Sequence, residues 1–287
     1  MNINLLNTAV AEIKHDLETA ITTGQIQRKS YDNGHRAKEA LIRSQRLIMK
    51  IHEVTKASMS ESLTRQRIPH IIHPPMGQSS PELSVTGFIK AKKQDLVFIM
   101  NGAQLAPERL SDGPLAGEMD KMGREATGKS IVIGVRSQLS SVAKNFDTLM
   151  ERAFAETLNL RLRLPKLVMA EVYMLPIVEY DDVPMVRNTI GFKRGFVPVE
   201  KFIRTFLGIS GRDNQNLDGS LYKYDRSCLI LIDCRNQVPT IFTTLDSLKE
   251  QNVVSPTFQA DFNKLSPVNF CDDLISAYME RHPADPD

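Results

Sequence analysis

The chain has 287 residues, of which 41% are hydrophobic and 24% are charged. These fractions are close to those of an average soluble globular protein, and a chain of this length can bury an ample core, which excludes a largely disordered protein. The 36 basic and 34 acidic residues leave a net charge of +2. Any nucleic-acid surface must therefore come from local clusters of charge and not from the overall composition.

The three cysteines, Cys228, Cys234 and Cys271, show no CxxC spacing. This sparse, odd count argues against a disulfide framework and against a structural zinc site. The N-terminal residues lack the basic and apolar regions of a signal peptide, and no apolar run approaches the ~20 residues that span a membrane. We therefore expect a cytoplasmic protein with no membrane partner.

Residues 1–68 are predicted to form a helical N-terminal part. Apolar residues at helical spacing predict one helix over residues 3–22, which Gly24 ends, and a longer one over residues 35–60. The segment from Pro69 to Pro81 is rich in proline and glycine, a composition that predicts no regular structure.

Residues 83–180 are predicted to form a β-β-α-β core. The residues from 83 to 100 indicate two strand segments or one bent strand, and an irregular excursion over 101–129 separates them from the β-rich run 130–136. An amphipathic helix is expected over 137–164, ended by Pro165, and a strand follows over 166–178. The pattern predicts an α/β fold with a mixed central sheet flanked by helices, in a single domain over residues 1–287.

Residues 181–287 are predicted to form a C-terminal extension of this domain. We expect a helix near 199–207, a polar loop over 208–220, strands at 228–233 and 240–243, and a helix over 262–280. These segments lie outside the predicted core, which makes their loops candidates for recognition elements.

Polar residues at two strand ends point to a site in the core. Because side chains alternate across a strand, Gly134 and Arg136 share one face, and Gln138 joins them if the strand continues. Asp95 enters an apolar strand, where an unpaired carboxylate is costly, so it needs a cation or the guanidinium of Arg136 as a partner. Polar residues at neighbouring strand ends are the usual way in which an open α/β sheet displays a site.

This arrangement resembles the PD-(D/E)XK nuclease core, and in particular the type II restriction endonucleases. In that family an acidic residue begins or interrupts one strand, a second strand ends in acid-x-lysine, and an amphipathic helix and a further strand follow. Here Gln94-Asp95-Leu96 stands in the place of "PD", and Arg136-Ser137-Gln138 stands in the place of acid-x-lysine. The run from Val135 to Arg152 is also similar to part of a restriction-enzyme subfamily.

The resemblance implies a Mg²⁺-dependent, site-specific endonuclease of double-stranded DNA. It implies Asp95, Arg136, Gln138 and Glu61 as catalytic residues, with Arg136 on the phosphate and Gln138 orienting the water. Arginine replaces the motif's acid, so a second carboxylate for the metal must come from elsewhere. Asp95 is therefore expected to share Mg²⁺ with Glu61 or Glu118, and Asp120 is an alternative to Glu118.

DNA contacts are expected from basic and amide side chains around this core. The candidates are Lys92, Lys93, Ser137, Arg187, Asn188, Lys193 and Arg194, together with the polar loop 211–220. Palindromic DNA implies a homodimer, and a cognate DNA methyltransferase is the expected genetic partner.

Plainer readings of the same residues stay open. In these readings Asp95 forms a structural salt bridge with Arg136 or a nearby lysine, and Arg136 has a purely structural role. Ser137 would then be the N-cap of the following helix, Gln138 would form a hydrogen bond at the N-terminus of that helix, and Glu61 would be solvated or cap a helix. The alternative function is a non-catalytic DNA-binding or interaction module on a degenerate nuclease fold.

Overall fold

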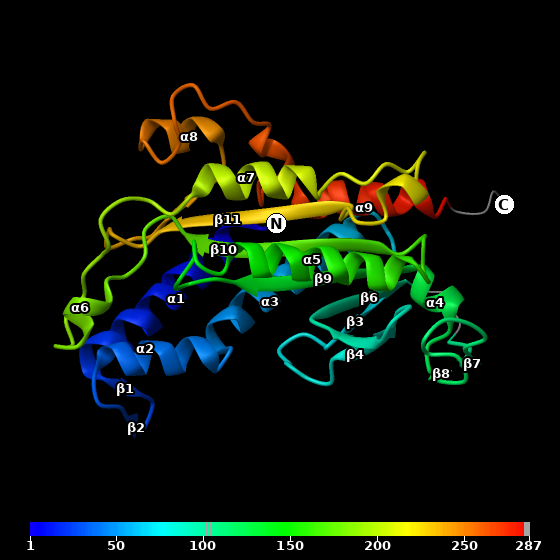
Figure 1. The fold of residues 1–287 in the computed structure, drawn as a ribbon, viewed down its shortest axis with the longest axis horizontal. Helices are drawn as coiled ribbons and strands as arrows, with labels where there is room; N and C mark the ends of the chain where they lie inside the picture. The colour runs from blue at the N-terminus through cyan, green and yellow to red at the C-terminus, as the bar shows by residue number, and fades with distance from the viewer. Residues whose placement is uncertain (101–102, 104, 284–287) are drawn as a thin grey trace.

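The computed structural model describes residues 1–100, 103 and 105–283, and Figure 1 gives the order of its elements. The helices of this part of the chain are α1 (Ile3–Thr23), α2 (Gly34–Arg43), α3 (Arg46–Arg65), α4 (Arg124–Gly128), α5 (Phe146–Arg161), α6 (Asp182–Met185), α7 (Val199–Gly208), α8 (Leu245–Glu250) and α9 (Phe270–Arg281), with short 3₁₀ helices η1 (Asp218–Ser220) and η2 (Phe262–Lys264). The strands are β1 (Gln25–Ile26), β2 (Lys29–Ser30), β3 (His70–His73), β4 (Leu83–Thr86), β5 (Ala91–Gln94), β6 (Leu96–Met100), β7 (Glu108–Arg109), β8 (Met119–Asp120), β9 (Ser130–Ser137), β10 (Val168–Pro176), β11 (Arg226–Asp233) and β12 (Thr240–Phe242).

A mixed six-stranded sheet forms the centre of the fold, in the order β12-β11-β10-β9-β6-β3. β9, β10 and β11 run parallel, while β6 is antiparallel to β9 and β3 is antiparallel to β6. The prediction of an α/β fold with a mixed central sheet flanked by helices is therefore confirmed.

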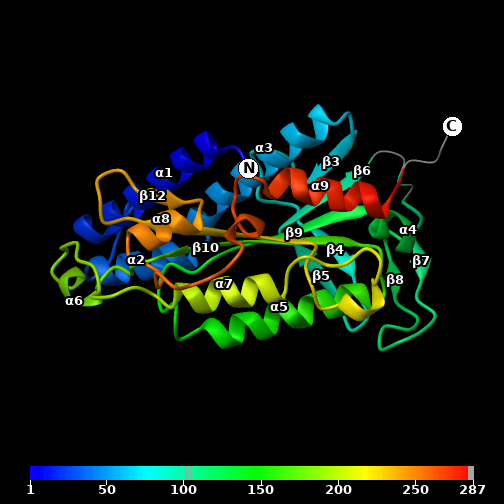
Figure 2. The ribbon, with the colours of Figure 1, turned by 90° about the horizontal axis from the view of Figure 1, so that it is seen from above.

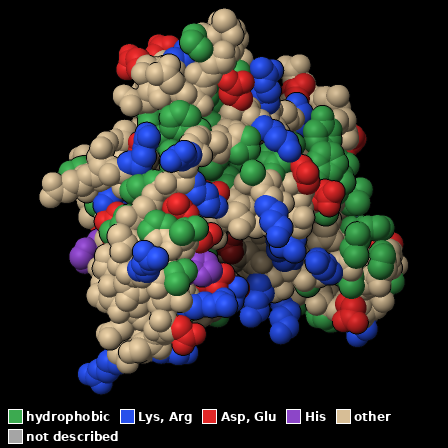
Figure 3. All heavy atoms as spheres, turned by 60° about the vertical axis from the view of Figure 1, so that its left-hand side comes forward, with side chains coloured by type: hydrophobic (Ala, Val, Ile, Leu, Met, Phe, Trp, Pro, Cys, Tyr) green, Lys and Arg blue, Asp and Glu red, His purple; other side chains and the backbone are tan. Residues whose placement is uncertain are grey.

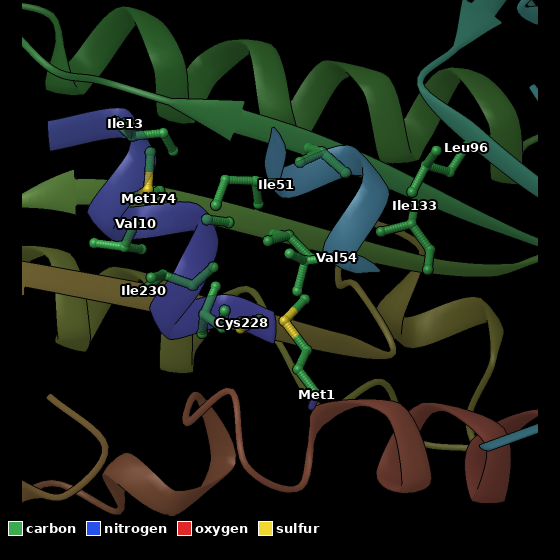
Figure 4. Close-up of a cluster of buried hydrophobic side chains, with 14 of the residues drawn as sticks. Met1, Val10, Ile13, Ile51, Val54, Leu96, Ile133, Met174, Cys228 and Ile230 are labelled. Atoms are coloured by element: carbon green, nitrogen blue, oxygen red, sulfur yellow. The ribbon is translucent and has the colours of Figure 1, made fainter. Parts of the chain in front are cut away.

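Helices cover both faces of the sheet, as the view from above shows (Figure 2). The larger apolar cluster joins α1, α3 and α9 to one face, and it includes Ile13, Ile51 and Leu274. Its packing against Ile133 and Cys228 of the sheet is drawn in Figure 4. A second cluster joins α5 and α7 to the opposite face, so the molecule has three layers, helix, sheet and helix.

The central strands are buried on both sides, which explains their nearly continuous apolar sequences. Every residue of β10 and of β6 is buried. A charged residue in such a strand must find its partner inside the protein or bind one from outside, because leaving it unpaired is costly.

Several predicted boundaries differ from the structure. The segment after Pro69 contains β3, whose pairing with β6 outweighs the local composition, so the prediction of no regular structure there was wrong. The predicted helix over 35–60 is two helices, separated at Ser44 and Gln45, where Gln45 takes a φ of 61°.

The helices after the strands also begin later than predicted. The helix expected from residue 137 begins at Phe146, because Ser137 still belongs to β9. The expected helix over 262–280 is a 3₁₀ turn followed by α9. The excursion over 101–129 contains the short ribbon β7–β8 and α4, while residues 101, 102 and 104 lie outside the described part.

None of the helices in the described part of the chain is both long enough and apolar enough to cross a membrane.

Candidate functional site

The predicted strand ends meet at one edge of the sheet. Leu96 pairs with Ile133 across the antiparallel β6–β9 ladder, and Gly134 pairs with Glu171 across the parallel β9–β10 ladder. Asp95 precedes Leu96, and its Oδ2 accepts a hydrogen bond of 2.8 Å from the backbone N–H of Val135. Asp95 and Glu171 therefore approach β9 from its two neighbouring strands at nearly the same level.

A cavity of about 300 Å³ opens at this edge. Asp95, Arg136 and Ser137 line it on the sheet side, and Tyr173 lines it from β10. The turn between α2 and α3 supplies Gln45 to the opposite wall. Figure 3 shows a face where Lys and Arg side chains gather around a hollow with acidic atoms in its depth.

Arg136 is held by two carboxylates other than Asp95. Its Nε lies 3.3 Å from Glu171 Oε1, and its terminal nitrogen donates to Glu156 of α5, which also pairs with Lys92. The pKa of Arg136 is raised, chiefly by the charge of Glu171. The ion pairs of Arg136 are therefore with Glu156 and Glu171 and not with the expected partner Asp95, whose carboxylate binds the Val135 backbone.

Glu171 is the most unusual member of this network. Its side chain is 1% exposed, and neither carboxylate oxygen accepts a hydrogen bond from any described residue, although Arg136 is near. Burial raises the pKa of Glu171 to about 7, against the opposing effect of Arg136. A buried carboxylate without hydrogen-bond donors favours binding of a proton or a cation, because either one offsets its negative charge.

Gly134 makes the room that Glu171 occupies. A Cβ atom on Gly134 would lie 2.4 Å from Glu171 Oε2, closer than any real side chain allows. The carboxylate thus fills the space beside β9 where a side chain of that strand would otherwise project. Both Glu171 and Asp95 consequently lie against the Gly134–Val135 peptide unit.

No family model matches the chain, and no curated protein and no solved structure was found to be similar to it.

The carboxylates expected to assist Asp95 lie elsewhere. Glu61 is exposed near the end of α3 and accepts a hydrogen bond from Asn2. On the same helix, His52 is the residue whose pKa is affected by the charge of Asp95. Glu61 lies about 13 Å further along the helix axis than His52. Glu118 is exposed beside the β7–β8 ribbon, and Asp120 is buried in an ion pair with Arg163 at 2.7 Å.

A conventional three-ligand metal site is absent from residues 1–100, 103 and 105–283: no three His, Cys, Asp or Glu side chains there are grouped to hold an ion. The expected metal set of Asp95, Glu61 and Glu118 is therefore not brought together. Asp95 is the one member of that set that lines the cavity.

Ser137 lines the cavity, whereas Gln138 is buried beside it. The side-chain nitrogen of Gln138 donates to the Ser141 carbonyl at 2.8 Å, and its oxygen accepts from the Tyr173 hydroxyl at 2.7 Å. This engagement at both ends of the amide suits a positioning role better than the expected orientation of water. Ser137 does not cap the following helix, whose N-cap is Asn145.

The residues predicted to contact DNA divide into free and engaged side chains. Lys93, Arg187 and Arg194 are exposed. By contrast, Lys193 pairs with Glu179 at 3.3 Å, and the side-chain oxygen of Asn188 accepts a hydrogen bond of 2.7 Å from the Gly34 backbone. Asn188 thus connects α2 to the loop after α6, a structural role that its sequence context did not suggest.

Three residues of the site were not anticipated: Glu171, Glu156 and His52. Glu171 carried a readable signal, because it is the one charged residue within the otherwise apolar strand 168–176. His52 is buried on α3, where burial lowers its pKa while Asp95 and the Val135 carbonyl oppose that effect. Glu156 and His52 lie on helices, and only the packing of those helices brings them near β9.

Proposed function

We propose that the protein is a Mg²⁺-dependent, site-specific endonuclease of double-stranded DNA, of the type II restriction class. The observation that carries this proposal is the shared cavity of Asp95 and the end of β9. It lies in a run of strand β6, strand β9, helix α5 and parallel strand β10. This is the order of elements around the acidic residue and the motif strand in the nuclease core that the sequence resembles.

The charges of the cavity suit a phosphodiester substrate. The Arg136 side chain is partly exposed and lines the cavity, so its guanidinium can bind a non-bridging phosphate oxygen while Glu156 and Glu171 fix its orientation. Lys92 and the exposed Lys93 precede Asp95 in the chain and extend the positive rim. A water oxygen would attack phosphorus as the bond to the leaving sugar oxygen breaks.

The donor set fits a magnesium ion held by two carboxylates. Mg²⁺ keeps several waters and needs only one or two protein carboxylates. Glu171 has two oxygens without a hydrogen-bond donor among the described residues, and its charge couples to that of Asp95. Asp95 and Glu171 would hold the ion, which when bound lowers the pKa of a water and balances charge on the phosphate.

A second candidate is DNA binding without cleavage. It is favoured by the lack of a three-ligand metal group among the described residues. In this case the same cavity would hold a phosphate group and no metal.

Incubation of the purified protein with Mg²⁺ and unmethylated phage DNA tests both candidates. The nuclease proposal expects discrete fragments that disappear with a chelator and in the Asp95→Ala variant. The exposed Asp246 of α8 supplies a matched control, Asp246→Ala, which should cut normally. A gel shift without fragments supports the second candidate, and protein that neither binds nor cuts contradicts both.

A further inference from the structure

A second cavity lies at the opposite edge of the sheet, where β11 begins. Its volume is about 570 Å³, within the range of small-ligand sites. The residues around it are Leu207, Ser210, Gly211, Lys223, Arg226, Asp261, Lys264 and Asp273. They come from the end of α7, the loop before β11, the region of η2 and α9.

Cationic side chains outnumber acidic ones on this lining. Lys223, Arg226 and Lys264 face two carboxylates, and Lys264 pairs with Asp261 at 3.4 Å. One terminal nitrogen of Arg226 donates to the Asp225 carbonyl, which fixes this guanidinium against the start of β11. The lining alone therefore carries an excess of one positive charge.

Beside this lining lies a buried cluster of three arginines and one aspartate, Asp225, which pairs with two of them. Arg161 and Arg281 each contact Asp225 at 2.6 Å. Arg212, which follows Gly211 of the lining, has only the carbonyls of Pro165 and Leu217 as acceptors, at 2.7 and 2.8 Å. The three arginine side chains and Asp225 are all buried.

The cluster has more donors than the described residues can satisfy. Nε and one terminal nitrogen of Arg161 and Nε of Arg212 have no hydrogen-bond partner there. One acceptor, Asp225 Oδ1, also lacks a hydrogen bond, although Arg281 lies 2.6 Å away, so the unmet nitrogens still outnumber the unmet oxygen. Burial and the neighbouring arginines lower the pKa of Arg212 to about 9. An uncompensated buried positive charge is costly, and a bound anion would offset it.

We propose that this second cavity binds a phosphoryl group, with Lys223 and Arg226 as its direct contacts and the buried arginines supplying a positive field. Guanidinium and ammonium groups in one concave site are the usual recognition of phosphate. Gly211 has a φ of 75° and open space where a side chain would stand, so the backbone can approach the ligand there. The inference does not depend on the proposed nuclease activity, because the cavity lies at the other end of the strands from Asp95.

Two sources can present a phosphoryl group, a free nucleotide and the backbone of DNA. Thermal unfolding with inorganic phosphate, with adenosine monophosphate and with a chloride control of equal ionic strength tests the site directly. Saturating phosphate should raise the unfolding midpoint by about 5 °C. The shift should be largely lost in a Lys223→Gln, Arg226→Gln double variant and kept in Lys249→Gln on α8.

The comparison with the variants is essential because phosphate also stabilises proteins by exclusion from their surface. An equal shift in wild type and double variant, or none in either, overturns the proposal. Lys223→Gln alone is the second variant, since its side chain makes no hydrogen bond or ion pair within the described residues and should not affect folding. It should weaken phosphate binding about tenfold.

A gel shift with a short duplex distinguishes the two sources. Weaker duplex binding by the double variant, with no stabilisation by the monophosphate, assigns the site to the DNA backbone. Stabilisation by the monophosphate with unchanged duplex binding assigns it to a free nucleotide. Phosphate stabilisation is measured without DNA, and Lys249→Gln should keep both that stabilisation and duplex binding. Loss of cleavage in Asp95→Ala and loss of phosphate binding in the double variant are therefore separate outcomes.

Discussion

The two ends of the parallel strands carry opposite mismatches of charge. At the carboxyl end, the buried Glu171 has two oxygens with no donor from the described residues. At the amino end, three nitrogens of Arg161 and Arg212 have no acceptor there, and they outnumber the one unmet acceptor, Asp225 Oδ1. One sheet therefore has an excess of unmet acceptors at one end of its parallel strands and of unmet donors at the other, and the complementary ligands are a cation and an anion, respectively.

Asp225 is the buried counter-charge of the arginines at the amino end. Removal of its side chain is therefore expected to have the largest effect on the free energy of unfolding. Asp225→Ala leaves Arg161 and Arg281 without their shared partner and removes the acceptor of the Met169 N–H. Breaking a buried ion pair on one side costs about 3–5 kcal/mol, which urea unfolding measures. The control is Asp218→Ala in η1, where the side chain is exposed, and it should cost less than about 0.5 kcal/mol. If Asp225→Ala and Asp218→Ala had equally small effects on the unfolding free energy, the buried arginines would not need Asp225 as a counter-charge, and the contrast between the two ends of the strands would be wrong.

The mismatch at the carboxyl end predicts a pH-dependent stability in chelator-containing, metal-free buffer. The pKa of Glu171 is about 7 in the folded protein against 4.5 ordinarily. Its contribution is therefore present below the ordinary pKa and is lost as the pH rises through about 7. Between pH 5 and pH 8, Glu171→Gln should gain about 2 kcal/mol of unfolding free energy relative to wild type.

Glu125→Gln on α4 is the control for this titration, because Glu125 is exposed. It should follow the wild-type pH dependence throughout. If the stability of Glu171→Gln had the same pH dependence as that of wild type, Arg136 would keep Glu171 ionised from pH 5 to pH 8. The carboxylate at this end of the strands would then be paired in charge, and the contrast with the amino end would be smaller than the missing hydrogen bonds indicate.

The layers of the fold were readable from the sequence, since they rest on local patterns. The helix from residue 3, the apolar strands after Asp95 and Ser130, and the helix before Pro165 all follow from periodicity and breakers. β3 was missed because its four residues lie between Pro69 and Pro74, and their extended conformation depends on pairing with β6. Such pairing is a long-range property that composition does not contain.

The location of the Asp95 cavity could be predicted from the sequence, whereas the residues that complete it could not. Arg136 was located from strand alternation and Asp95 as a carboxylate that enters an apolar strand, and both line one cavity. Glu156 reaches Arg136 only through the packing of α5 on the sheet, and Glu171 does so only through the β9–β10 register. Sequence spacing carries no information on either, and the choice of Glu61 and Glu118 as partners of Asp95 reflects that gap.

The smallest expected effect probes the contact between Gly134 and Glu171. A methyl group at Gly134 collides with Glu171 Oε2, and overpacking of this kind should outweigh the usual gain from replacing glycine, for a net cost of about 1 kcal/mol. In a Glu171→Ala background the collision is absent, so Gly134→Ala should become neutral or stabilising, a coupling that a double-mutant cycle in urea measures. Gly128→Ala, with nothing near its added Cβ, is the control. Additive effects of Gly134→Ala and Glu171→Ala would mean that the Glu171 carboxylate can turn away from the new methyl group at no cost. The lack of hydrogen-bond donors to Glu171 would then depend on one orientation of its side chain and not on the structure of the sheet at this end.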